Sequence, residues 1–232
     1  MTAAATVSAI GANLAAVRGR IERACQRSGR SPADVTLIAV TKTWPAETVL
    51  AAMEAGLADF GENRVQEGVA KAAEVARATR NQALVPPVWH LIGHLQTNKV
   101  RAALGTFAIL HAVDSERLLR VIDGNATNPV PLMIEVNVAA EPTKYGILPE
   151  QLPDVLDVAR GLTNVRVTGL MTVAPRVSEP EGVRPVFGEL RKLAERHGLR
   201  HLSMGMSEDF ETAIEEGATH IRVGRALFGE RQ

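Results

Sequence analysis

Lys42 is the residue whose type and position most directly predict chemistry. It ends the largely apolar run Val35–Lys42, which is typical of a buried strand, so its amine is expected at the carboxyl end of a core strand. Burial disfavours the charged form of an amine, and an uncharged lysine is nucleophilic enough to form a Schiff base. The alternative is an ordinary lysine that points into water, because lysine is almost never fully buried.

Two loops near the C-terminus have the composition of a phosphate site. The segments Leu202–Ser207 and Ile221–Gly229 each follow a strand-like run. Small residues such as Gly205 and Gly224 let backbone N–H groups approach an anion, and a helix N-terminus adds positive potential. The alternative is that both glycines only make tight turns and that Ser207 only caps a helix.

Arg222 lies inside the last strand-like run, where a permanent positive charge needs a partner. If Lys42 on the first strand holds an aldehyde and the last two loops hold a phosphate, one small molecule spans them. Pyridoxal phosphate fits, with its aldehyde on the amine, its phosphate on the loops and its ring nitrogen at the arginine. A salt bridge from Arg222 to Glu135 explains the arginine equally well, so the residues alone leave both explanations open.

The elements that must position these residues alternate along the chain. One apolar stripe predicts a helix over Val7–Ser28, and further helix-like stretches separate eight strand-like runs. Such alternation favours parallel βαβ units, and eight units close into a barrel. An open doubly wound sheet is the alternative, but its Gly-x-Gly-x-x-Gly turn is missing after the first strand. The predicted strands are Thr36–Val40, Asp59–Gly61, Val88–Ile92, Ala108–Val113, Leu132–Val136, Val165–Met171, His201–Met204 and His220–Val223.

We therefore predict an α/β fold with a single domain over residues 1–232, a (β/α)8 TIM barrel with an extra N-terminal helix. Its core is expected to be aliphatic, because hydrophobic residues make up 46% of the 232 residues and aromatic residues only 3%. The chain has 26 basic and 26 acidic residues, which gives no electrostatic footprint for nucleic acid or an anionic membrane.

Cysteine content and terminal sequence narrow the cellular context. Cys25 is the single cysteine, which excludes an intramolecular disulfide and a multi-cysteine zinc site. His90 and His94 are spaced i, i+4 but straddle a strand end, so no metal site is predicted. The sequence has no recognisable signal peptide and no apolar stretch near the roughly 20 residues of a membrane span, so we expect a cytoplasmic protein.

Several short segments, in this order, resemble one family. The chain resembles the pyridoxal phosphate homeostasis proteins of the YggS/PROSC type, and the resemblance extends over most of the sequence. The matching segments are Leu37–Thr43, Phe60–Glu67, Trp89–Lys99, Glu135–Asn137, Glu141–Gly146, Gly169–Met171, Leu202–Asp209, Ile221–Gly224 and Leu227–Gly229.

The resemblance implies a barrel similar to the barrel domain of alanine racemase, with pyridoxal 5'-phosphate as a reversible Schiff base on Lys42. It places Arg222 at the ring nitrogen and Asn63 near the ring, with His90 and Asn137 lining the barrel mouth. The residues that the resemblance places around the phosphate are Ser203, Met204, Gly224 and Arg225, with Ser207 either adding a hydroxyl or capping its helix. Position 225 is usually a small hydroxyl residue in the family, so Arg225 is a departure from the pattern.

The resemblance also implies a cofactor carrier without an established reaction, in which pyridoxal phosphate-dependent apo-enzymes are transient partners. We expect a monomer, because the additional domain of alanine racemase is absent from the sequence. The enzyme alternative is a slow racemase or lyase with Tyr145 or His90 as a second acid/base group. An aldolase-like barrel, in which Lys42 attacks a sugar phosphate, is a third hypothesis. Lys99 and Lys144 are further amines that could hold a second cofactor molecule.

Overall fold

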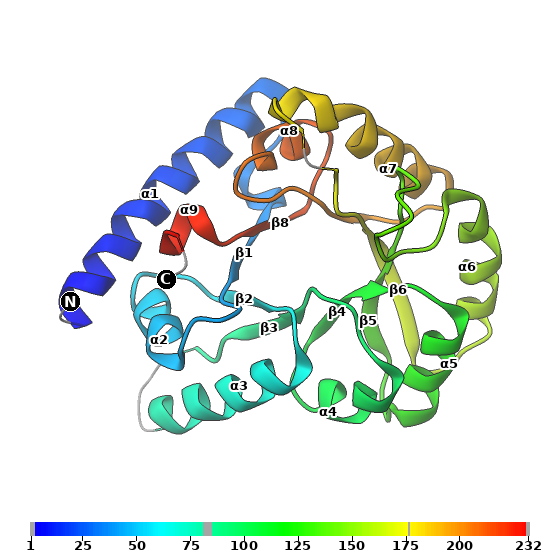
Figure 1. Cartoon of the computed structure of the whole chain (residues 1–232), viewed down its shortest axis with the longest axis horizontal. Coiled ribbons are helices and arrows are strands. Elements are labelled where there is room, and N and C mark those ends of the chain that lie inside the picture. The colour runs from blue at the N-terminus through cyan, green and yellow to red at the C-terminus, as the bar shows by residue number, and fades with distance from the viewer. Residues whose placement is uncertain (1–2, 81–84, 176, 231–232) are drawn as a thin grey trace.

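The chain forms a closed barrel of parallel strands in the order of the sequence (Figure 1). The computed structural model describes residues 3–80, 85–175 and 177–230. The last strand pairs with the first, with Ile38 opposite Arg222, and this pairing closes the barrel and confirms the predicted fold class. The strands are β1 (Thr36–Val40), β2 (Asp59–Glu62), β3 (Val88–Leu91), β4 (Ile109–Val113), β5 (Val130–Glu135), β6 (Val165–Met171), β7 (His201–Ser203) and β8 (His220–Val223).

Helices surround the barrel, and the predicted N-terminal helix is present (Figure 1). Helix α1 packs along α2, α8 and α9, so it covers the seam where the first and last strands meet. The α-helices are α1 (Ala3–Ser28), α2 (Ala46–Glu54), α3 (Val65–Thr79), α4 (Val100–Leu104), α5 (Glu116–Asn125), α6 (Leu152–Arg160), α7 (Arg184–Arg196), α8 (Phe210–Glu215) and α9 (Arg225–Phe228).

The predicted strand boundaries lie within two residues of the observed ones, whereas helix α1 begins at Ala3, four residues before the predicted Val7. Helix α8 begins at Phe210, three residues after Ser207, which was considered as its cap. The side chain of Asp209 accepts a hydrogen bond from the backbone N–H of Met206 at 2.6 Å, and this bond stabilises a turn in place of the first helical residues. Ser207 therefore does not cap α8.

The barrel wall separates an apolar layer from a partly polar interior. Alternate strand residues such as Phe60, Leu202 and Ile221 point into the main hydrophobic core between strands and helices. Inside the barrel, the apolar cluster of buried residues is small and consists of Ala112, Met133 and Met171. Buried polar side chains from β3, β4, β7 and β8 share the interior with it; they are His90, His111, Ser203, His220 and Arg222.

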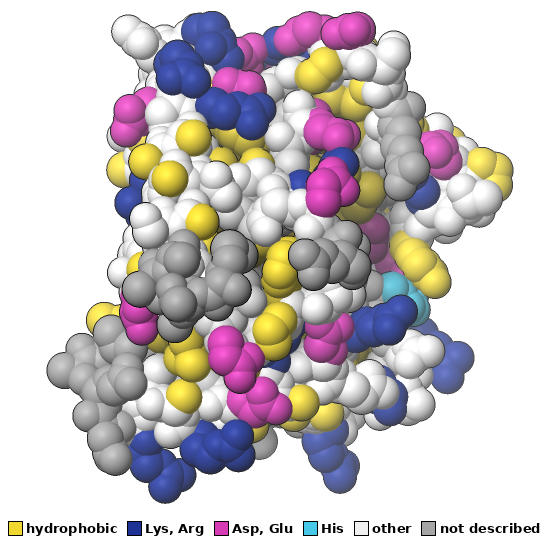
Figure 2. All heavy atoms as spheres, turned by 60° about the vertical axis from the view of Figure 1, so that its left-hand side comes forward, with side chains coloured by type: hydrophobic (Ala, Val, Ile, Leu, Met, Phe, Trp, Pro, Cys, Tyr) yellow, Lys and Arg dark blue, Asp and Glu magenta, His cyan; other side chains and the backbone are white. Residues whose placement is uncertain are grey.

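The surface carries both signs of charge. On the face shown in Figure 2, basic and acidic side chains are interspersed, as expected for a chain with 26 residues of each sign. This face has no extended basic area of the kind that binds nucleic acid. No helix in the described part of the chain is both long and apolar enough to cross a membrane.

Candidate functional site

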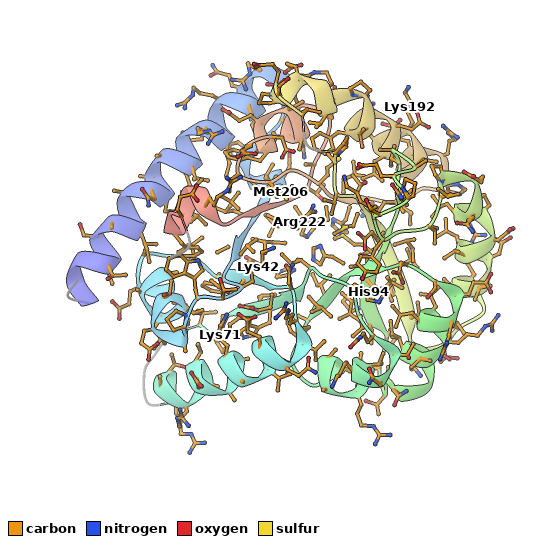
Figure 3. The ribbon with its side chains drawn as sticks, viewed as in Figure 1. Lys42, Lys71, His94, Lys192, Met206 and Arg222 are labelled. Carbon is orange, nitrogen blue, oxygen red and sulfur yellow. The ribbon has the colours of Figure 1, made fainter. Side chains whose placement is uncertain are left out.

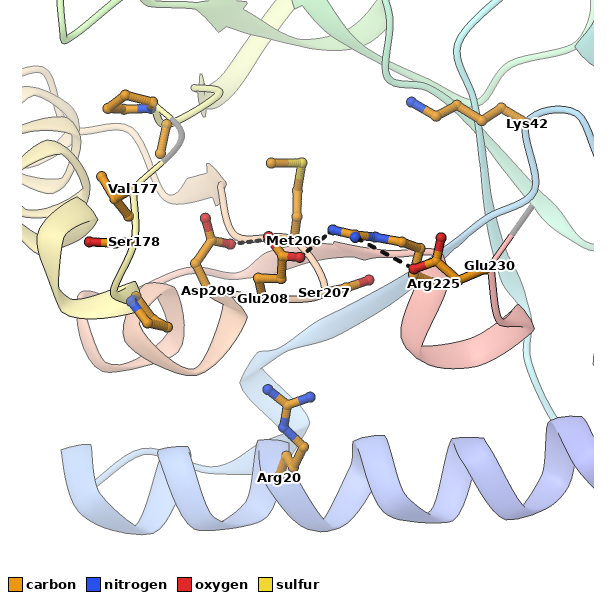
Figure 4. A pocket seen from close by; sticks show the side chains of 13 residues that line it. Arg20, Lys42, Val177, Ser178, Met206, Ser207, Glu208, Asp209, Arg225 and Glu230 are labelled. Atoms are coloured by element: carbon orange, nitrogen blue, oxygen red, sulfur yellow. Dashed lines mark hydrogen bonds and ion pairs between the residues drawn. The ribbon is translucent and has the colours of Figure 1, made fainter. Parts of the chain in front are cut away.

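An open cavity of about 940 Å³ lies where the loops after β1, β6, β7 and β8 meet. In the close-up of Figure 4, the Lys42 side chain reaches over the cavity from one side, and Ser207 and Arg225 lie on another wall. Arg20 reaches it from α1. The cavity lies at the carboxyl ends of the strands, which is where TIM barrels place their functional sites. It is lined by Arg20, Lys42, Ala174, Pro175, Val177, Ser178, Pro180, Met206, Ser207, Glu208, Asp209, Arg225 and Glu230.

Lys42 follows the carboxyl end of β1, whose observed bounds are the predicted ones. Strand β1 ends at Val40, and Lys42 is half-buried in the turn that follows. The backbone N–H of Trp44 donates to the carbonyl of Thr41 at 3.0 Å, which closes the turn, and Thr43 adopts a positive φ of 69°. The turn directs the Lys42 amine toward the cavity rather than into the barrel wall (Figure 4).

A buried network of charges holds the backbone on both sides of Lys42. The Lys71 ammonium on α3 donates to the Thr41 carbonyl at 2.7 Å and to Glu62 Oε1 at 2.6 Å. Glu67 Oε1 accepts from the Thr43 backbone N–H at 2.5 Å and from Lys71 at 3.1 Å. The Lys71 and Glu62 side chains are only 6% and 0% exposed. This network fixes the turn that presents Lys42.

Sequence reasoning missed the role of Lys71. Lys71 and Glu67 have the i, i+4 spacing of an ordinary solvated helix pair, and nothing local in the sequence distinguishes the two cases. Burial raises the pKa of Glu62, although hydrogen bonds from Lys71 and Thr41 oppose the shift. Glu62 Oε2 is buried and has no hydrogen-bond partner among the described residues, so this carboxylate depends strongly on Lys71.

Arg222 lies inside the barrel and is 5% exposed. Its Nη1 donates to the Ser203 hydroxyl at 2.7 Å, and its Nη2 donates to the Thr172 carbonyl at 2.9 Å. Both partners are neutral, so these bonds are not the salt bridge to Glu135 that was considered as the alternative. A guanidinium has five N–H groups, and these two bonds leave others to meet a ligand. In the end-on view of Figure 3, Arg222 lies near the centre of the barrel with Lys42 to one side.

The acid that was considered as a partner for Arg222 is itself unusual. Burial, reinforced by the negative charge of Asp114, raises the pKa of Glu135 to about 7, and the Arg222 charge opposes this shift. Burial also lowers the pKa of Arg222 to about 10, which still leaves the guanidinium charged at neutral pH. The interior thus holds a cation, Arg222, and an acid that acts on it, Glu135, which is only partly ionised at neutral pH.

The predicted phosphate loops meet at Ser207. Its hydroxyl accepts from the backbone N–H of Gly224 at 3.3 Å and from that of Ala226 at 3.4 Å. Both bonds are longer than an ordinary N–H···O bond, so a phosphate oxygen could replace the hydroxyl on these donors. Gly224 has a negative φ of −119°, so this glycine is not required by backbone conformation. The residues present fit a small anion.

Two residues expected around the phosphate lie behind the cavity wall. Ser203 is fully buried with its hydroxyl on Arg222, and the Met204 backbone N–H donates to the His220 carbonyl at 3.1 Å. Gly205, by contrast, has the positive φ of 90° that its predicted turn requires, and a side chain there would collide with Phe210 and Ala213.

Arg225 borders the cavity but is bound to acids in this structure. Its guanidinium donates to Glu208 at 2.5 Å and lies 3.9 Å from Glu230, and Figure 4 shows both pairs. The Arg225 side chain is 51% exposed, which makes these pairs easy to exchange for another anion. Position 225 therefore offers a positive charge where a hydroxyl was expected.

Several other predicted residues are separated from the cavity. Asn63 is half-buried just after β2. Its carbonyl packs so closely on Gly93 that a side chain at position 93 would clash with it. The Asn137 side chain closes its own turn through two bonds to the backbone of Glu141. His90, expected at the barrel mouth, is 1% exposed and lies inside the barrel.

The remaining histidine and lysine candidates do not converge. His94 stacks on Tyr145 with ring centroids 4.3 Å apart and bonds to Asp114, so it does not meet His90. The Lys144 amine donates to the Val173 carbonyl at 3.2 Å. Within the described residues, no group of three or more His, Cys, Asp or Glu side chains could hold a metal ion.

Similarity to known proteins agrees with this geometry. Residues 12–232 match the family described as alanine racemase, N-terminal domain. A pyridoxal phosphate homeostasis protein of Aquifex aeolicus is 43% identical over 228 residues and covers 94% of this chain and 97% of its own length. The corresponding Pseudomonas aeruginosa protein is 41% identical over 230 residues and covers 97% of each chain. The chain belongs to the pyridoxal phosphate homeostasis protein family. The predicted resemblance is confirmed.

Solved structures of this family and of alanine racemase share the fold. PipY of Synechococcus elongatus, in its structure with pyridoxal phosphate bound, has a TM-score of 0.80 at 36% identity and covers 95% of this chain and 100% of its own. Alanine racemase of Corynebacterium glutamicum has a TM-score of 0.68 at 18% identity and covers 97% of this chain and 62% of its own. At that identity the racemase supports the fold alone.

Proposed function

We propose that this protein binds pyridoxal 5'-phosphate through Lys42 and serves in the homeostasis of that cofactor. The observation that carries the proposal is the shared cavity, with the Lys42 amine on one side and the Ser207–Gly224 anion site and Arg225 on another. The family relative PipY, described with this cofactor bound, supports the same assignment. The cofactor supplies an aldehyde that condenses reversibly with a primary amine.

The proposal gives each residue a separate task. Lys42 holds the aldehyde end, and Arg222 donates an N–H to the ring nitrogen from inside the barrel. Ser207 and the Gly224 backbone hold the phosphate, with Arg225 able to exchange Glu208 for it. Ser203 and Met204 lie behind the wall around this molecule, and Asn63 is assigned no contact with it.

A carrier fits these residues better than an enzyme does. An arginine at the ring nitrogen keeps that nitrogen unprotonated, which weakens the electron-withdrawing power that amino-acid chemistry needs. His90 has both ring nitrogens engaged inside the barrel, and Tyr145 is 60% exposed and stacked on His94. Neither is well placed as the second acid/base group of a slow racemase or lyase. We expect a cytoplasmic monomer that passes the cofactor to apo-enzymes transiently.

A titration followed by a transfer assay tests the proposal. Purified protein is titrated with pyridoxal phosphate while its visible absorbance is recorded, and the loaded protein is then mixed with a pyridoxal phosphate-dependent apo-enzyme. We expect saturable uptake, loss of that uptake in Lys42→Ala, and activation of the apo-enzyme. Lys99→Ala and Lys144→Ala are the matched controls and should load normally.

Two outcomes would contradict the carrier. Exchange of an amino-acid α-proton that is lost in Lys42→Ala would favour the racemase or lyase. A protein that takes up no pyridoxal phosphate, but is trapped by borohydride with a sugar phosphate, would favour the aldolase-like alternative.

A further inference from the structure

A chain of hydrogen bonds runs through the barrel interior from Arg222 to the opposite end. Arg222 Nη1 donates to Ser203 Oγ at 2.7 Å, and Ser203 Oγ lies 2.9 Å from His111 Nδ1. His111 Nε2 lies 3.0 Å from His90 Nδ1, and His90 Nε2 lies 3.0 Å from Asp59 Oδ1. Asp59 begins β2 and its side chain is 29% exposed, so the chain of hydrogen bonds runs from near solvent at Asp59 to the buried guanidinium of Arg222.

The two ends of the chain fix the direction of every bond in it. A guanidinium can only donate, so the Ser203 hydroxyl accepts from Arg222 and has its own O–H to give. An ionised carboxylate can only accept, so His90 Nε2 carries a proton for Asp59. His90 Nδ1 then accepts from His111 Nε2–H, and His111 Nδ1 accepts the Ser203 O–H. Two neutral imidazoles satisfy all four contacts.

A protonated histidine satisfies the chain less well. With a proton on both nitrogens of His90, His111 must turn its Nδ1–H toward Ser203, and the Ser203 O–H then has no acceptor among the contacts that the structure gives it. A buried donor without a partner is costly. Burial lowers the pKa of His111 well below its usual value, and the neighbouring His90, His220 and Arg222 act in the same direction.

The surroundings of the chain favour neutral rings as well. The His220 ring lies 5.7 Å from that of His111 and 6.4 Å from that of His90, and burial lowers the pKa of His220 to about 3. Arg222 is a further cation beside these rings, and His201 is a further titratable ring. The acids that act on the cluster are Asp59, Glu135 and Asp209. Adding a proton would place a second cation beside Arg222.

We propose that His111 is a positioning residue for Arg222: with His90 and Asp59, it orients the Ser203 hydroxyl so that the oxygen lone pairs face the guanidinium. This inference rests on the proposed function in one respect, namely that Arg222 faces the ring of a bound cofactor. The hydrogen-bond chain itself is a property of the cofactor-free protein. Its arrangement holds the guanidinium in one orientation before any ligand arrives.

Nitrogen NMR of the histidine rings in the cofactor-free protein tests the chain directly. We expect His111 to be neutral at neutral pH with its proton on Nε2, and His90 to carry a proton on Nε2. An Nδ1–H tautomer of His111 would overturn the assigned direction. This result does not depend on whether Lys42 binds a cofactor, so it separates failure of the chain from failure of the proposed function.

Substitutions test whether the chain positions Arg222. His111→Phe removes both ring nitrogens, whereas His111→Asn keeps an acceptor that can face Ser203. We expect hydrogen exchange of the Arg222 guanidinium to accelerate about tenfold in His111→Phe. In His111→Asn the exchange rate should lie close to that of the wild type. His201→Phe is the matched control, because the His201 Nδ1 has no hydrogen-bond partner among the described residues and this histidine is outside the chain.

The loaded protein supplies the link to the cofactor. We expect His111→Phe to shift the pyridoxal phosphate absorbance band and its pH dependence, and His111→Asn and His201→Phe to resemble the wild type. Wild-type exchange of Arg222 together with a wild-type spectrum in His111→Phe would overturn the proposal. If His111→Phe does not fold, the Asn variant and the ring tautomers still decide it.

Discussion

The two cations of the candidate site are held by different kinds of interaction. The turn that carries Lys42 is held by charges in the layer between strands and helices, where Lys71 joins Glu62 and Glu67. Arg222 is held inside the barrel by neutral groups, the Ser203 hydroxyl and the Thr172 carbonyl. The charged network holds the backbone beside a reactive amine, whereas the neutral partners orient a guanidinium that stays charged at neutral pH. Substitutions around Lys42 and substitutions around Arg222 should therefore differ in their effects.

The largest effect is expected on the charged side, from Lys71→Met. Removing the ammonium leaves the fully buried Glu62 carboxylate without its cation, which typically costs about 3–5 kcal/mol. Because burial already raises the pKa of Glu62, the variant should regain part of its stability as acid protonates this group. Urea unfolding at neutral and acidic pH measures both effects.

The double variant Glu62→Gln/Lys71→Met is the control for this prediction. It removes both charges. Replacing both members of a buried ion pair often changes the free energy of unfolding little, so most of the lost stability should return. If Lys71→Met alone unfolds at the wild-type urea concentration, the charged network does not support the Lys42 turn in the way described.

The next effect concerns the neutral side and its pH dependence. Glu135 has a folded pKa of about 7 against an ordinary 4.5, so the folded state holds a proton that the unfolded state has lost. Stability should therefore fall as the pH rises from about 4.5 to about 7, by roughly 3 kcal/mol from this group, and then level off. Glu135→Gln should flatten this part of the curve.

The same measurement decides how Glu135 relates to Arg222. An ion pair between them would favour the ionised carboxylate and reverse the slope of stability against pH. The wild type would then gain stability as the pH rises, and Glu135→Gln would lack this gain. Thermal unfolding of both proteins across this pH range distinguishes the two. Asp154→Asn, a substitution in the first turn of α6, is the control for a general carboxylate effect.

A smaller effect is expected at the anion site. Ser207→Ala removes a hydroxyl that can donate its own O–H to a phosphate oxygen once that oxygen has replaced it on the Gly224 and Ala226 N–H groups, and we expect the affinity for pyridoxal phosphate to fall about tenfold. Ser178→Ala is the matched control, because Ser178 lines the same cavity from the loop after β6. Equal affinities of the two variants, measured by absorbance titration, would remove Ser207 from the site.

The smallest effect is expected from Arg225→Ser. The exposed pairs with Glu208 and Glu230 should contribute no more than about 1 kcal/mol to stability. The serine also introduces the small hydroxyl residue that the resemblance led us to expect at this position. We expect the melting temperature and the cofactor affinity to stay near wild type, and a large loss of affinity would show that the guanidinium is a principal phosphate ligand.

The barrel could be predicted because its signals are local and repeated. Eight apolar runs alternate with helix-like stretches, and the closing pair of β1 and β8 follows from the count. The start of α8 could not be predicted, since Ser207, Glu208 and Asp209 all resemble helix starts. The bond from Asp209 to the Met206 backbone, which depends on the loop geometry, decides between them.

The candidate site was predicted in part. Lys42, Ser207 and Arg225 border one cavity, and Arg222 lies inside the barrel below the mouth. Lys71 and His111 were missed because their roles depend on contacts across the fold: Lys71 reaches Glu62 from a neighbouring helix, and His111 meets Ser203 from 92 residues away. Neither spacing has a local signature.

The central claim is that Lys42 holds the cofactor. Borohydride reduction of the protein mixed with pyridoxal phosphate, followed by peptide mapping by mass spectrometry, tests it most directly. We expect one stoichiometric pyridoxyl modification, on the peptide that contains Lys42, and none in Lys42→Ala. Stoichiometric modification of Lys71, Lys99 or Lys144 with Lys42 unmodified would contradict it.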